Sequence, residues 1–321
     1  MLNKRLLCID AGSEYCPCYL AETGDCITCS ILRGQDFCDC NWRGSCIYSE
    51  FVWNDYVKKN SRKFYSSKIL KKESLGNEVY LLKIETTKTL ARQLKQPGAY
   101  IFIRGEGLPQ FFDVPMSIMQ ANEKEGYVYI VYKVLGTKTK RLNESDNILI
   151  RGPYWNGIYG LNNIKTLKNN NCLLIARGVA QAPTLLLINK IVKNNNITLI
   201  LDKGKLEDNF ILNYLSHKNI EIIFIDTMKY KEQEYIKEIM IDKKIDFVFS
   251  AGSDIFHKKI IELIDEIDPS INISATNNSE ICCGEGVCGA CSAHLENEGS
   301  VKGCKTQIDI RELIKRRVNI D

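Results

Sequence analysis

The sequence lacks an apolar run of membrane-spanning length and carries almost no excess of charge of either sign. Without about 20 consecutive apolar residues, it predicts no membrane-spanning helix. The net charge is only +4 in 321 residues, and no dense lysine and arginine block with interleaved aromatics occurs, which argues against nucleic acid as the main partner. The first residues, MLNKRLLCID, offer only a short apolar stretch before Asp10. They do not predict a signal peptide, so we expect a cytoplasmic protein.

Histidine is also scarce, with three residues in the chain. His217 and His257 fall in or near expected helices, and we interpret both as surface residues. His294 lies in a cysteine-rich loop, where its role as a bystander or as a modulator of that loop stays open. None of the three is predicted to be catalytic.

Cysteine, in contrast, is abundant, but it is almost missing from the middle of the chain. Of 14 cysteines, eight lie between Cys8 and Cys46 and five between Cys282 and Cys304, and only Cys172 lies between these groups. Without an export signal, such cysteines indicate metal binding rather than disulfides. The layout is typical of a redox protein from an anaerobic or strongly reducing cytoplasm. Cys172 precedes a run of Leu and Ile and is expected in a buried strand.

The stretch 281–306, here called the C-terminal cysteine loop, holds four cysteines at a distinctive spacing: Cys283, Cys288, Cys291 and Cys304. The pattern C-x4-C-x2-C followed by a distant cysteine is the plant-type ligand set of a [2Fe–2S] cluster. Glycines between the cysteines let backbone amides approach bridging sulfides. A zinc site or an unliganded loop is the alternative, although zinc sites more often show two C-x2-C pairs. Cys282 is interpreted as a bystander.

Residues 1–60, here called the head, have little hydrophobic periodicity and are rich in cysteine: Cys8, Cys16, Cys18, Cys26, Cys29, Cys38, Cys40 and Cys46. A segment this short buries too little apolar area to fold alone, so metal ligation is the natural stabiliser. Eight thiolates suffice for two four-coordinate centres. Whether the metal is a second iron–sulfur cluster or zinc, and which cysteines share it, stays open. Trp42 and Trp53 are expected to pack over the head.

Residues 61–160 contain short runs rich in Ile, Val, Tyr and Phe that are separated by Gly, Pro and polar turns. The expected strands are 63–70, 79–85, 99–104, 127–134 and 147–150, with a short helix over 89–94. This spacing predicts a small antiparallel β-barrel. Three loops stand out, at 113–118, 136–139 and 152–157. Considered alone, each of them is expected to be a simple turn and not a binding site.

Residues 161–275 alternate between strands and helices. Strands are expected at 172–176, 197–201, 220–225 and 247–250, and helices at 185–193, 210–217, 230–240 and 255–267. This alternation predicts a doubly wound parallel sheet that binds ligands at the carboxyl ends of its strands. A glycine-containing turn follows the first strand, where helix amides suit a pyrophosphate. Asp202 ends the second strand, where an acidic group suits the ribose 2′-OH of NAD, while Lys203 and Lys205 suit a 2′-phosphate.

The order of these parts carries a resemblance. A barrel with D-V-P-M-S-I, G-T-K-T and G-P-Y-W-N-G, an α/β domain with R-G-V-A-Q-A-P and A-G-S, and then the cysteine loop resembles the ferredoxin–NADP reductase superfamily. It is most similar to the electron-transfer subunit of type B dihydroorotate dehydrogenase. It also resembles the small subunits of sulfide dehydrogenase and of NADH-dependent ferredoxin:NADP oxidoreductase. The resemblance covers about residues 61–310, and the head resembles a leader on some related flavoproteins of anaerobes.

The resemblance implies residue roles. For FAD it implies contacts from Pro115, Met116, Ser117, Ile118, Gly136, Thr137, Thr139, Gly152 and Pro153. Among these, Ser117 matches the hydroxyl that faces the flavin N5, and Met116 takes an aromatic position. For NAD(P) it implies contacts from Gly178, Ala182, Pro183, Gly252 and Ser253, together with Asp202. Val114 replaces the family arginine that would hold the FAD pyrophosphate. Arg177 and Ala180 replace two glycines of the nicotinamide loop, which weakens the NAD(P) match.

The expected function is that of an FAD- and iron–sulfur-containing oxidoreductase subunit. It would move electrons between NAD(P)H, with a slight preference for NAD, and a second subunit or a ferredoxin-like carrier. Hydride transfer between nicotinamide and flavin requires no acid–base side chain. One alternative is the small subunit of a flavin-based electron-bifurcating complex. Another is a metal-stabilised interaction or sensor protein whose reductase body no longer binds nucleotide. The expected domains are a head (1–60), an FAD barrel (61–160), an NAD(P) domain (161–275) and a [2Fe–2S] domain (276–321).

Overall fold

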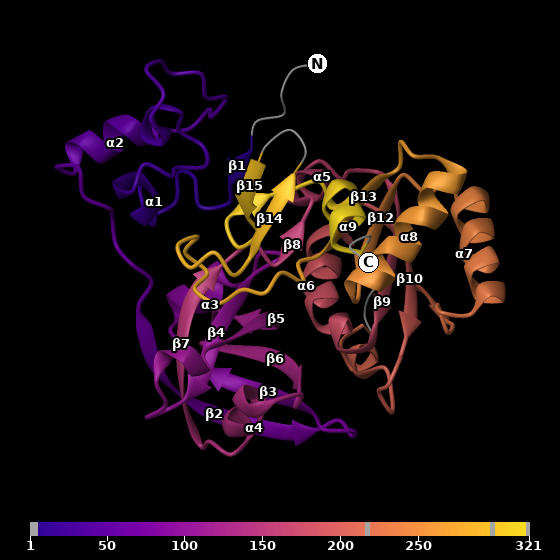
Figure 1. The fold of residues 1–321 in the computed structure, drawn as a ribbon. Helices are drawn as coiled ribbons and strands as arrows, with labels where there is room; N and C mark the ends of the chain where they lie inside the picture. Colours follow the sequence, from indigo (N-terminus) through magenta and orange to yellow (C-terminus); the bar gives the residue numbers. More distant parts are fainter. Residues whose placement is uncertain (1–5, 216–218, 296–298, 319–321) are drawn as a thin grey trace. The chain divides into compact units, whose positions relative to one another are not determined.

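The computed structural model describes residues 6–215, 219–295 and 299–318, and the chain divides into two compact units (Figure 1). Unit 1 combines residues 1–64 with residues 279–308. Unit 2 combines residues 65–278 with residues 309–321. The head and the C-terminal cysteine loop, which the sequence predicts as separate domains, thus contribute to the same unit. The predicted barrel and α/β domain share the other.

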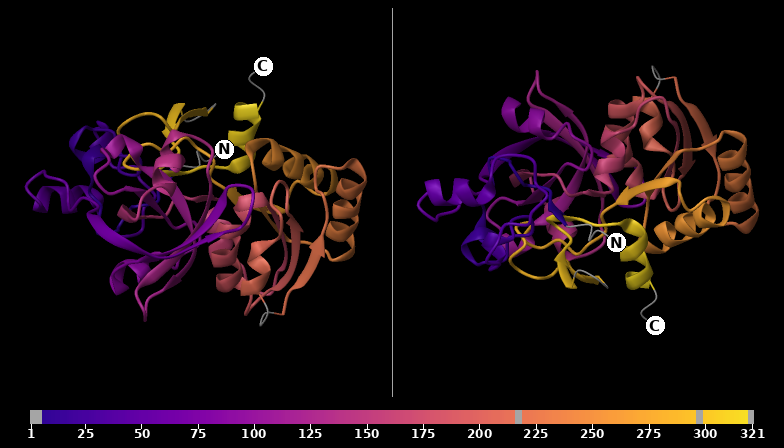
Figure 2. Two further views of the ribbon diagram at one scale, coloured as in Figure 1. Left: turned by 90° about the horizontal axis from the view of Figure 1, so that it is seen from below. Right: turned by 90° about the horizontal axis from the view of Figure 1, so that it is seen from above.

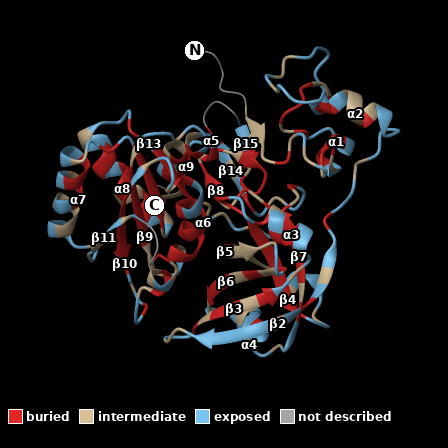
Figure 3. Cartoon of the chain, turned by 180° about the vertical axis from the view of Figure 1, so that it is seen from behind, coloured by how far each residue is buried: buried red, intermediate tan, exposed pale blue. Residues whose placement is uncertain are grey.

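The first half of unit 2 is a closed antiparallel barrel in the order β2-β3-β6-β5-β4-β7. Its strands are β2 (Phe64–Ser74), β3 (Val79–Glu85), β4 (Tyr100–Gly105), β5 (Val114–Asn122), β6 (Tyr127–Lys133) and β7 (Asn147–Tyr154). Three short helices accompany it: α3 (Lys88–Gln93), α4 (Thr137–Asn143) and the 3-10 helix η2 (Gln110–Phe112). Alternate side chains fill the interior, whereas most of β2 is exposed (Figure 3). The predicted barrel is confirmed.

The second half of unit 2 is a six-stranded sheet in the order β11-β10-β9-β12-β13-β8. Its parallel strands are β9 (Asn171–Arg177), β10 (Asn196–Asp202), β11 (Glu221–Phe224), β12 (Phe247–Ala251) and β13 (Asn272–Thr276), and β8 (Ile158–Tyr159) is antiparallel. The strand order reverses between β9 and β12, which is the switch point where open α/β sheets bind ligands. The predicted doubly wound sheet is confirmed.

Helices cover both faces of this sheet. They are α5 (Leu161–Lys165), η3 (Gly178–Ala180), α6 (Gln181–Ile191), η4 (Phe210–Tyr214), α7 (Tyr230–Asp242), α8 (Asp254–Ile267) and α9 (Ile310–Val318). Helix α7 packs on α8, and α8 packs on α9. These three helices lie on one side of the strands, and α6 lies on the other (Figures 1 and 2). The sequence predicts neither β8, β13 nor α9. The helix expected at 210–217 is instead the short η4, and its predicted end, His217, lies outside the described residues.

Unit 1 has little regular structure. The head contributes β1 (Leu7–Cys8), α1 (Tyr19–Glu22), the 3-10 helix η1 (Ile31–Arg33) and α2 (Ile47–Trp53). The C-terminal part contributes the β14 (Ser292–Leu295) and β15 (Gly299–Lys302) hairpin and β16 (Thr306–Gln307). Strands β1 and β16 pair antiparallel, with Cys8 opposite Thr306. Backbone hydrogen bonds therefore join the start of the head to the end of the C-terminal cysteine loop.

None of the helices in the described ranges combines the length and the apolar character needed to cross a lipid bilayer.

Candidate functional site

A cleft of ≈ 630 Å³ lies in unit 2, between the barrel and the carboxyl ends of the parallel strands. This volume is in the range of small-molecule sites. Of the residues predicted to bind FAD or NAD(P), the structure brings together in this cleft those from four separate loops: Pro115, Met116, Ser117, Thr139, Gly178, Ala182, Pro183, Gly252 and Ser253. Residues that are far apart in the sequence thus line one space.

Strand β5 forms the barrel side of the cleft. In its ladder with β4, Met116 lies opposite Ile101 and Ser117 lies opposite Tyr100. Because side chains alternate along a strand, Met116 packs into the barrel core while Ser117 remains half-buried at the cleft wall. Ser117 is therefore held at the cleft wall by a strand of the barrel, and its predicted contact with FAD stays a prediction.

The start of β5 is held by a buried charge cluster that the sequence analysis missed. Arg104 and Arg151 donate to different oxygens of the Asp113 carboxylate, and the bond from Arg151 Nη2 is 3.1 Å long. All three side chains are buried. Both arginines stand in otherwise apolar strands, AYIFIRG and NILIRGPY, and buried arginine requires a partner. An arginine within an apolar strand is therefore the sequence signal that would have identified this cluster.

The turn between β9 and α6 forms the opposite wall. Gly178 has φ of +59°, a conformation that favours glycine, and an added Cβ would meet no atom within 4 Å. The preceding Arg177 lines the cleft and donates from Nε to Asp202 Oδ2 at 2.8 Å. An exposed glycine turn beside a cation at a helix start suits an anionic group such as a phosphate.

Asp202 does not line the cleft but a neighbouring pocket of ≈ 350 Å³ that also contains Arg177. Its carboxylate accepts hydrogen bonds from Arg177, from the Gly204 amide at 2.7 Å, and from the amide and hydroxyl of Thr227 at 3.0 and 2.6 Å. Four donors within the protein already engage it. A ribose hydroxyl would have to compete with them, and the role of Asp202 stays a prediction.

The remaining predicted FAD residues lie outside the cleft. Gly136 and Thr137 line an adjacent pocket of ≈ 600 Å³ at the start of α4. The Thr139 hydroxyl is engaged locally, since it accepts from the amides of Leu135 and Gly136 at 3.0 and 3.2 Å. Three further residues, Ile118, Gly152 and Pro153, are buried and do not line the cleft.

His257 is fully buried, so its predicted surface position is wrong. It lies on the face of α8 that carries Phe256, Ile260 and Ile264, which is the buried face of the helix. Its ring bonds Ser250 Oγ at 2.7 Å and the Thr276 carbonyl at 3.2 Å. Burial lowers the pKa of His257 to about 4, which keeps the ring neutral. The residue supports the strand ends beneath the cleft and does not enter it.

The four predicted cluster ligands lie close together within unit 1. The Cys304 thiol hydrogen-bonds to Cys283 and Cys291, and Cys288 bonds to Cys283. The bond from Cys304 lowers the pKa of Cys283 to about 4 and that of Cys291 to about 6, and it raises the pKa of Cys304. The amides of Glu285 and Cys304 also donate to sulfur, each at 3.3 Å. The four sulfurs thus form a connected set that receives amide hydrogen bonds.

The [2Fe–2S] cluster itself stays a prediction. Within the described ranges, no group of three or more Cys, His, Asp or Glu side chains is arranged to hold a metal ion. Gly286 adopts φ of +81°, and an added Cβ would lie 3.0 Å from Leu20 and 3.4 Å from Lys305. The loop is closely packed around its glycines.

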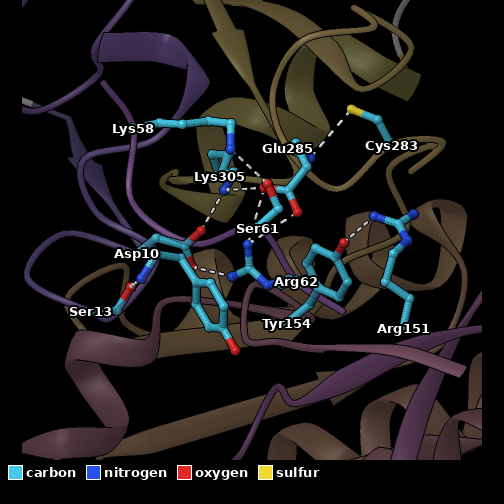
Figure 4. A network of polar contacts seen from close by, with 11 residues as sticks. Asp10, Ser13, Lys58, Ser61, Arg62, Arg151, Tyr154, Cys283, Glu285 and Lys305 are labelled. Atoms are coloured by element: carbon cyan, nitrogen blue, oxygen red, sulfur yellow. Dashed lines mark hydrogen bonds and ion pairs between the residues drawn. The ribbon is translucent and has the colours of Figure 1, made fainter. Parts of the chain in front are cut away.

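A second charge cluster joins the head to the C-terminal cysteine loop within unit 1 (Figure 4). Arg62 donates to Asp10 at 2.8 Å and to Glu285 at 3.1 Å, and Lys305 Nζ bonds Glu285 at 2.9 Å and also Asp10. Burial raises the pKa of Asp10, but Lys305 and Arg62 lower it by more, so the net shift is downward. Two cations and two anions balance, and the Tyr15 ring lies 4.2 Å from the Arg62 guanidinium. The sequence analysis missed this cluster, because its members are far apart in sequence.

In the head, Cys16, Cys26 and Cys29 are buried and belong to a small apolar core with Leu32 and Phe51. The other predicted ligands are half-buried or exposed: Cys8, Cys18 and Cys40 are half-buried, and Cys38 and Cys46 are exposed.

The two tryptophans of the head differ. Trp42 packs against the apolar core of the head, as predicted. Trp53 is 81% exposed, so its predicted packing is wrong. It is the last residue of α2, where its side chain points away from the buried face formed by Ile47 and Phe51.

No protein-family model matches the chain. Among curated proteins, the chain is 24% identical over 247 residues to the electron transfer subunit of dihydroorotate dehydrogenase B (NAD(+)) of Clostridium perfringens. That match spans 75% of this chain and 94% of the relative. It is 26% identical over 249 residues to the gamma subunit of sulfhydrogenase 1 of Pyrococcus furiosus, which spans 70% of this chain and 83% of the relative.

Solved structures show the same fold. An NADH-dependent reduced ferredoxin–NADP oxidoreductase studied for flavin-based electron bifurcation aligns with a TM-score of 0.61 and 20% identity, over 78% of this chain and 92% of that one. A ferredoxin reductase of carbazole 1,9a-dioxygenase aligns with a TM-score of 0.51 and 11% identity, over 70% and 71%. The fold and the sequence relatives together confirm the predicted resemblance to the ferredoxin–NADP reductase superfamily, with electron-transfer subunits among the related proteins.

Proposed function

We propose that the chain is the electron-transfer subunit of an NAD(P)H-dependent oxidoreductase. FAD and NAD(P) bind to unit 2, and a [2Fe–2S] cluster binds to the C-terminal cysteine loop of unit 1. The observation that carries the proposal is the cleft, which combines the barrel strand β5 with the loops after β9 and β12. Such a cleft at the switch point of a doubly wound sheet suits a flavin and a dinucleotide side by side.

The residues around the cleft divide between binding and orientation. Ser117 offers a hydroxyl from a rigid strand, where Asp113 and its two arginines fix the strand's start. Lys133, Lys205 and Arg177 bring positive charge to the cleft lining. These three side chains supply the positive charge that the family arginine would supply at position 114. Cofactor phosphate groups therefore still have cationic partners in the cleft.

The cofactors supply complementary electron chemistry. Nicotinamide exchanges a hydride, flavin exchanges one or two electrons, and an iron–sulfur cluster exchanges one. The chain's own part is to hold each group in place and to exclude competing reactions. No side chain of the cleft has to move a proton for hydride exchange with flavin.

A partner protein completes the proposal. The curated relatives are named as subunits of dihydroorotate dehydrogenase B and of a sulfhydrogenase. By analogy, the chain passes electrons between NAD(P)H and a second subunit or a ferredoxin-like carrier. The role in flavin-based electron bifurcation that is described for one structural neighbour is a special case of this activity.

A second candidate is a metal-stabilised sensor whose reductase body no longer binds nucleotide. Arg177 favours it, because this residue stands where the family has glycine and its guanidinium is engaged by Asp202. Under this alternative, the cleft would bind neither flavin nor nicotinamide.

Cofactor analysis of the anaerobically purified full chain separates the two candidates. We expect FAD, iron and acid-labile sulfide, with visible absorption that NADH or NADPH bleaches. The variant Cys291→Ser should lose the C-terminal cluster and keep FAD. Cys172→Ser is the matched control, since this cysteine is equally buried but lies in β9, and it should keep both cofactors. A flavin-free protein that contains only zinc would refute the proposal.

A further inference from the structure

The eight cysteines of the head form two successive repeats of one pattern. The first repeat is Cys8, Cys16, Cys18 and Cys26, and the second is Cys29, Cys38, Cys40 and Cys46. In each repeat a central C-x-C pair is flanked by single cysteines. Seven residues separate the pair from each flanking cysteine in the first repeat, and eight and five residues do so in the second. A duplicated ligand pattern suggests two centres of the same kind.

The first repeat surrounds a small cavity of ≈ 20 Å³. All four of its cysteines line this cavity, together with apolar residues such as Leu20 and Ile47. No cysteine of the second repeat lines it. The thiols also interact electrostatically within the repeat: Cys16 with Cys18 and Cys26, and Cys8 with Cys18. Four cysteines from three separate segments therefore line one small space.

Backbone and side-chain contacts fix the first repeat in this arrangement. The Cys8 amide donates to the Thr28 hydroxyl at 3.0 Å, which ties β1 to the segment after Cys26. The Gly12 amide hydrogen-bonds to the Cys16 sulfur, and the Cys29 amide donates to the Cys26 sulfur at 3.4 Å. These hydrogen bonds hold Cys8, Cys16 and Cys26 in position around the cavity.

The second repeat gathers around a different point. Cys38 and Cys40 have their sulfurs 3.9 Å apart, and Cys40 interacts electrostatically with Cys29. Ser30 accepts from the Asp39 amide at 3.0 Å, which holds the segment between these cysteines against the residue next to Cys29. Cys46 is assigned to this repeat by its position in the pattern.

Cys26 and Cys29 form a C-x2-C motif, which the sequence pattern alone would assign to one metal. The two repeats place Cys26 in the first group and Cys29 in the second. Cys26 lines the small cavity and Cys29 does not. The two cysteines are nevertheless in contact, since the Cys29 amide donates to the Cys26 sulfur and their thiols interact electrostatically. The assignment of Cys29 to the second repeat therefore rests on the cavity lining and on the sequence pattern.

We propose that the head binds two separate metal centres, one on Cys8, Cys16, Cys18 and Cys26 and the other on Cys29, Cys38, Cys40 and Cys46. Zinc and iron–sulfur centres both take four thiolate ligands, and metal and sulfide analysis distinguishes them. The proposal concerns the head alone and stands whether or not unit 2 binds flavin.

The first centre is linked directly to the C-terminal cysteine loop. Cys8 lies in β1, opposite Thr306 of β16, and the next amide, of Ile9, donates to the Lys305 carbonyl at 2.7 Å. Lys305 follows Cys304, a predicted ligand of the C-terminal cluster. One hydrogen bond and a few covalent bonds thus join the ligands of both centres, as expected of consecutive sites in an electron-transfer path.

Metal analysis of single-cysteine variants tests the grouping. Iron, zinc and acid-labile sulfide per chain would be measured on the anaerobically purified full chain. Cys18→Ser and Cys40→Ser should each lose about half of the head's metal, and the double variant should lose all of it. Cys282→Ser, an exposed cysteine outside both repeats, is the control and should lose none. Complete loss in either single variant, or no loss in both, would overturn the two-centre proposal.

Alkylation of the unmodified chain gives the same information without any variant. Metal is removed stepwise with a chelator, and newly reactive cysteines are identified by mass spectrometry after each step. We expect two sets to appear in separate steps, with the members of each repeat together. Sets that mix the repeats, or eight cysteines that become reactive in one step, contradict the proposal. Flavin is not involved in this readout, so its outcome is distinct from that of the proposed function.

Discussion

The two units of the chain reach stability by different means. Unit 2 has an extensive apolar core within the barrel, and the central strands of its parallel sheet are almost fully buried. In unit 1, the head has an apolar cluster of seven buried residues, three of them cysteines, and the unit contains a cluster of four charged side chains. Burial of apolar area is enough to fold a domain of the size of unit 2. Unit 1 depends on groups that stabilise only when correctly paired or bound to metal.

The largest effect that this difference predicts is on metal removal. Chelation of the purified chain should expose the amides of β1 and β16 to hydrogen exchange, because unit 1 loses the bonds between thiolates and metal that hold it. The barrel and the parallel sheet should keep their protection, since their cores contain no metal ligand. Hydrogen exchange with mass spectrometry measures both in one sample. Equal loss of protection from hydrogen exchange in both units would show that unit 1 does not depend on metal more than unit 2 does.

The second-largest effect should follow from removing one of the buried charges of unit 1. Arg62→Met leaves Asp10 and Glu285 without one of their cations, and removal of one partner from a buried pair costs about 3–5 kcal/mol. Lys59→Met is a control within the same unit, because Lys59 makes a partly exposed pair with Glu50 at 3.3 Å and should change stability by less than about 1 kcal/mol. Denaturant unfolding, followed by the visible absorption of the metal centres, compares the two. Similar losses in both variants would show that burial of the ions is irrelevant.

Sequence and structure agree best where apolar periodicity decides the fold. The strand 79–85 is predicted with its observed bounds, since it is a short run of mostly apolar and β-branched residues bounded by polar turns. Polar networks were not predictable in the same way. Asp10 and Lys305 are 295 residues apart, and no local pattern in a single sequence pairs them. His257 was misplaced because a histidine on a helix is usually exposed, whereas here the 3.6-residue period puts it on the buried face.

Unit 2 contains one buried group whose titration should show in its stability. The pKa of His257 is lowered from 6.5 to about 4, chiefly by burial. In the unfolded chain the ring takes up a proton near pH 6.5, whereas the folded chain resists until about pH 4. Stability is therefore complete above pH 6.5 and falls as the pH decreases towards 4, by about 3 kcal/mol in total. Unfolding of the sheet measured across this range should show the slope, and His257→Gln should flatten it. An unchanged slope in this variant would exclude His257 as the source.

The smallest effect concerns the site and not the fold. Ser117→Ala removes a hydroxyl at the wall of the cleft, and the loss of one hydrogen bond to flavin should slow flavin reduction by NAD(P)H roughly tenfold. Stability and FAD content should change little, because Ser117 is only half-buried. Ser145→Ala, whose hydroxyl bonds the Arg141 carbonyl at 2.9 Å far from the cleft lining, is the control. Rapid-mixing absorption gives both rates, and equal rates would remove Ser117 from the site.

Anaerobic reduction of the full chain by NADH or NADPH, followed by visible absorption and electron paramagnetic resonance, tests the central claim most directly. The account predicts that flavin absorption is bleached and that a reduced [2Fe–2S] signal appears in the same titration. In Cys291→Ser the flavin should still be bleached while that signal is missing. A chain that shows neither flavin bleaching nor an iron–sulfur signal with either nucleotide would contradict the proposal of an electron-transfer subunit.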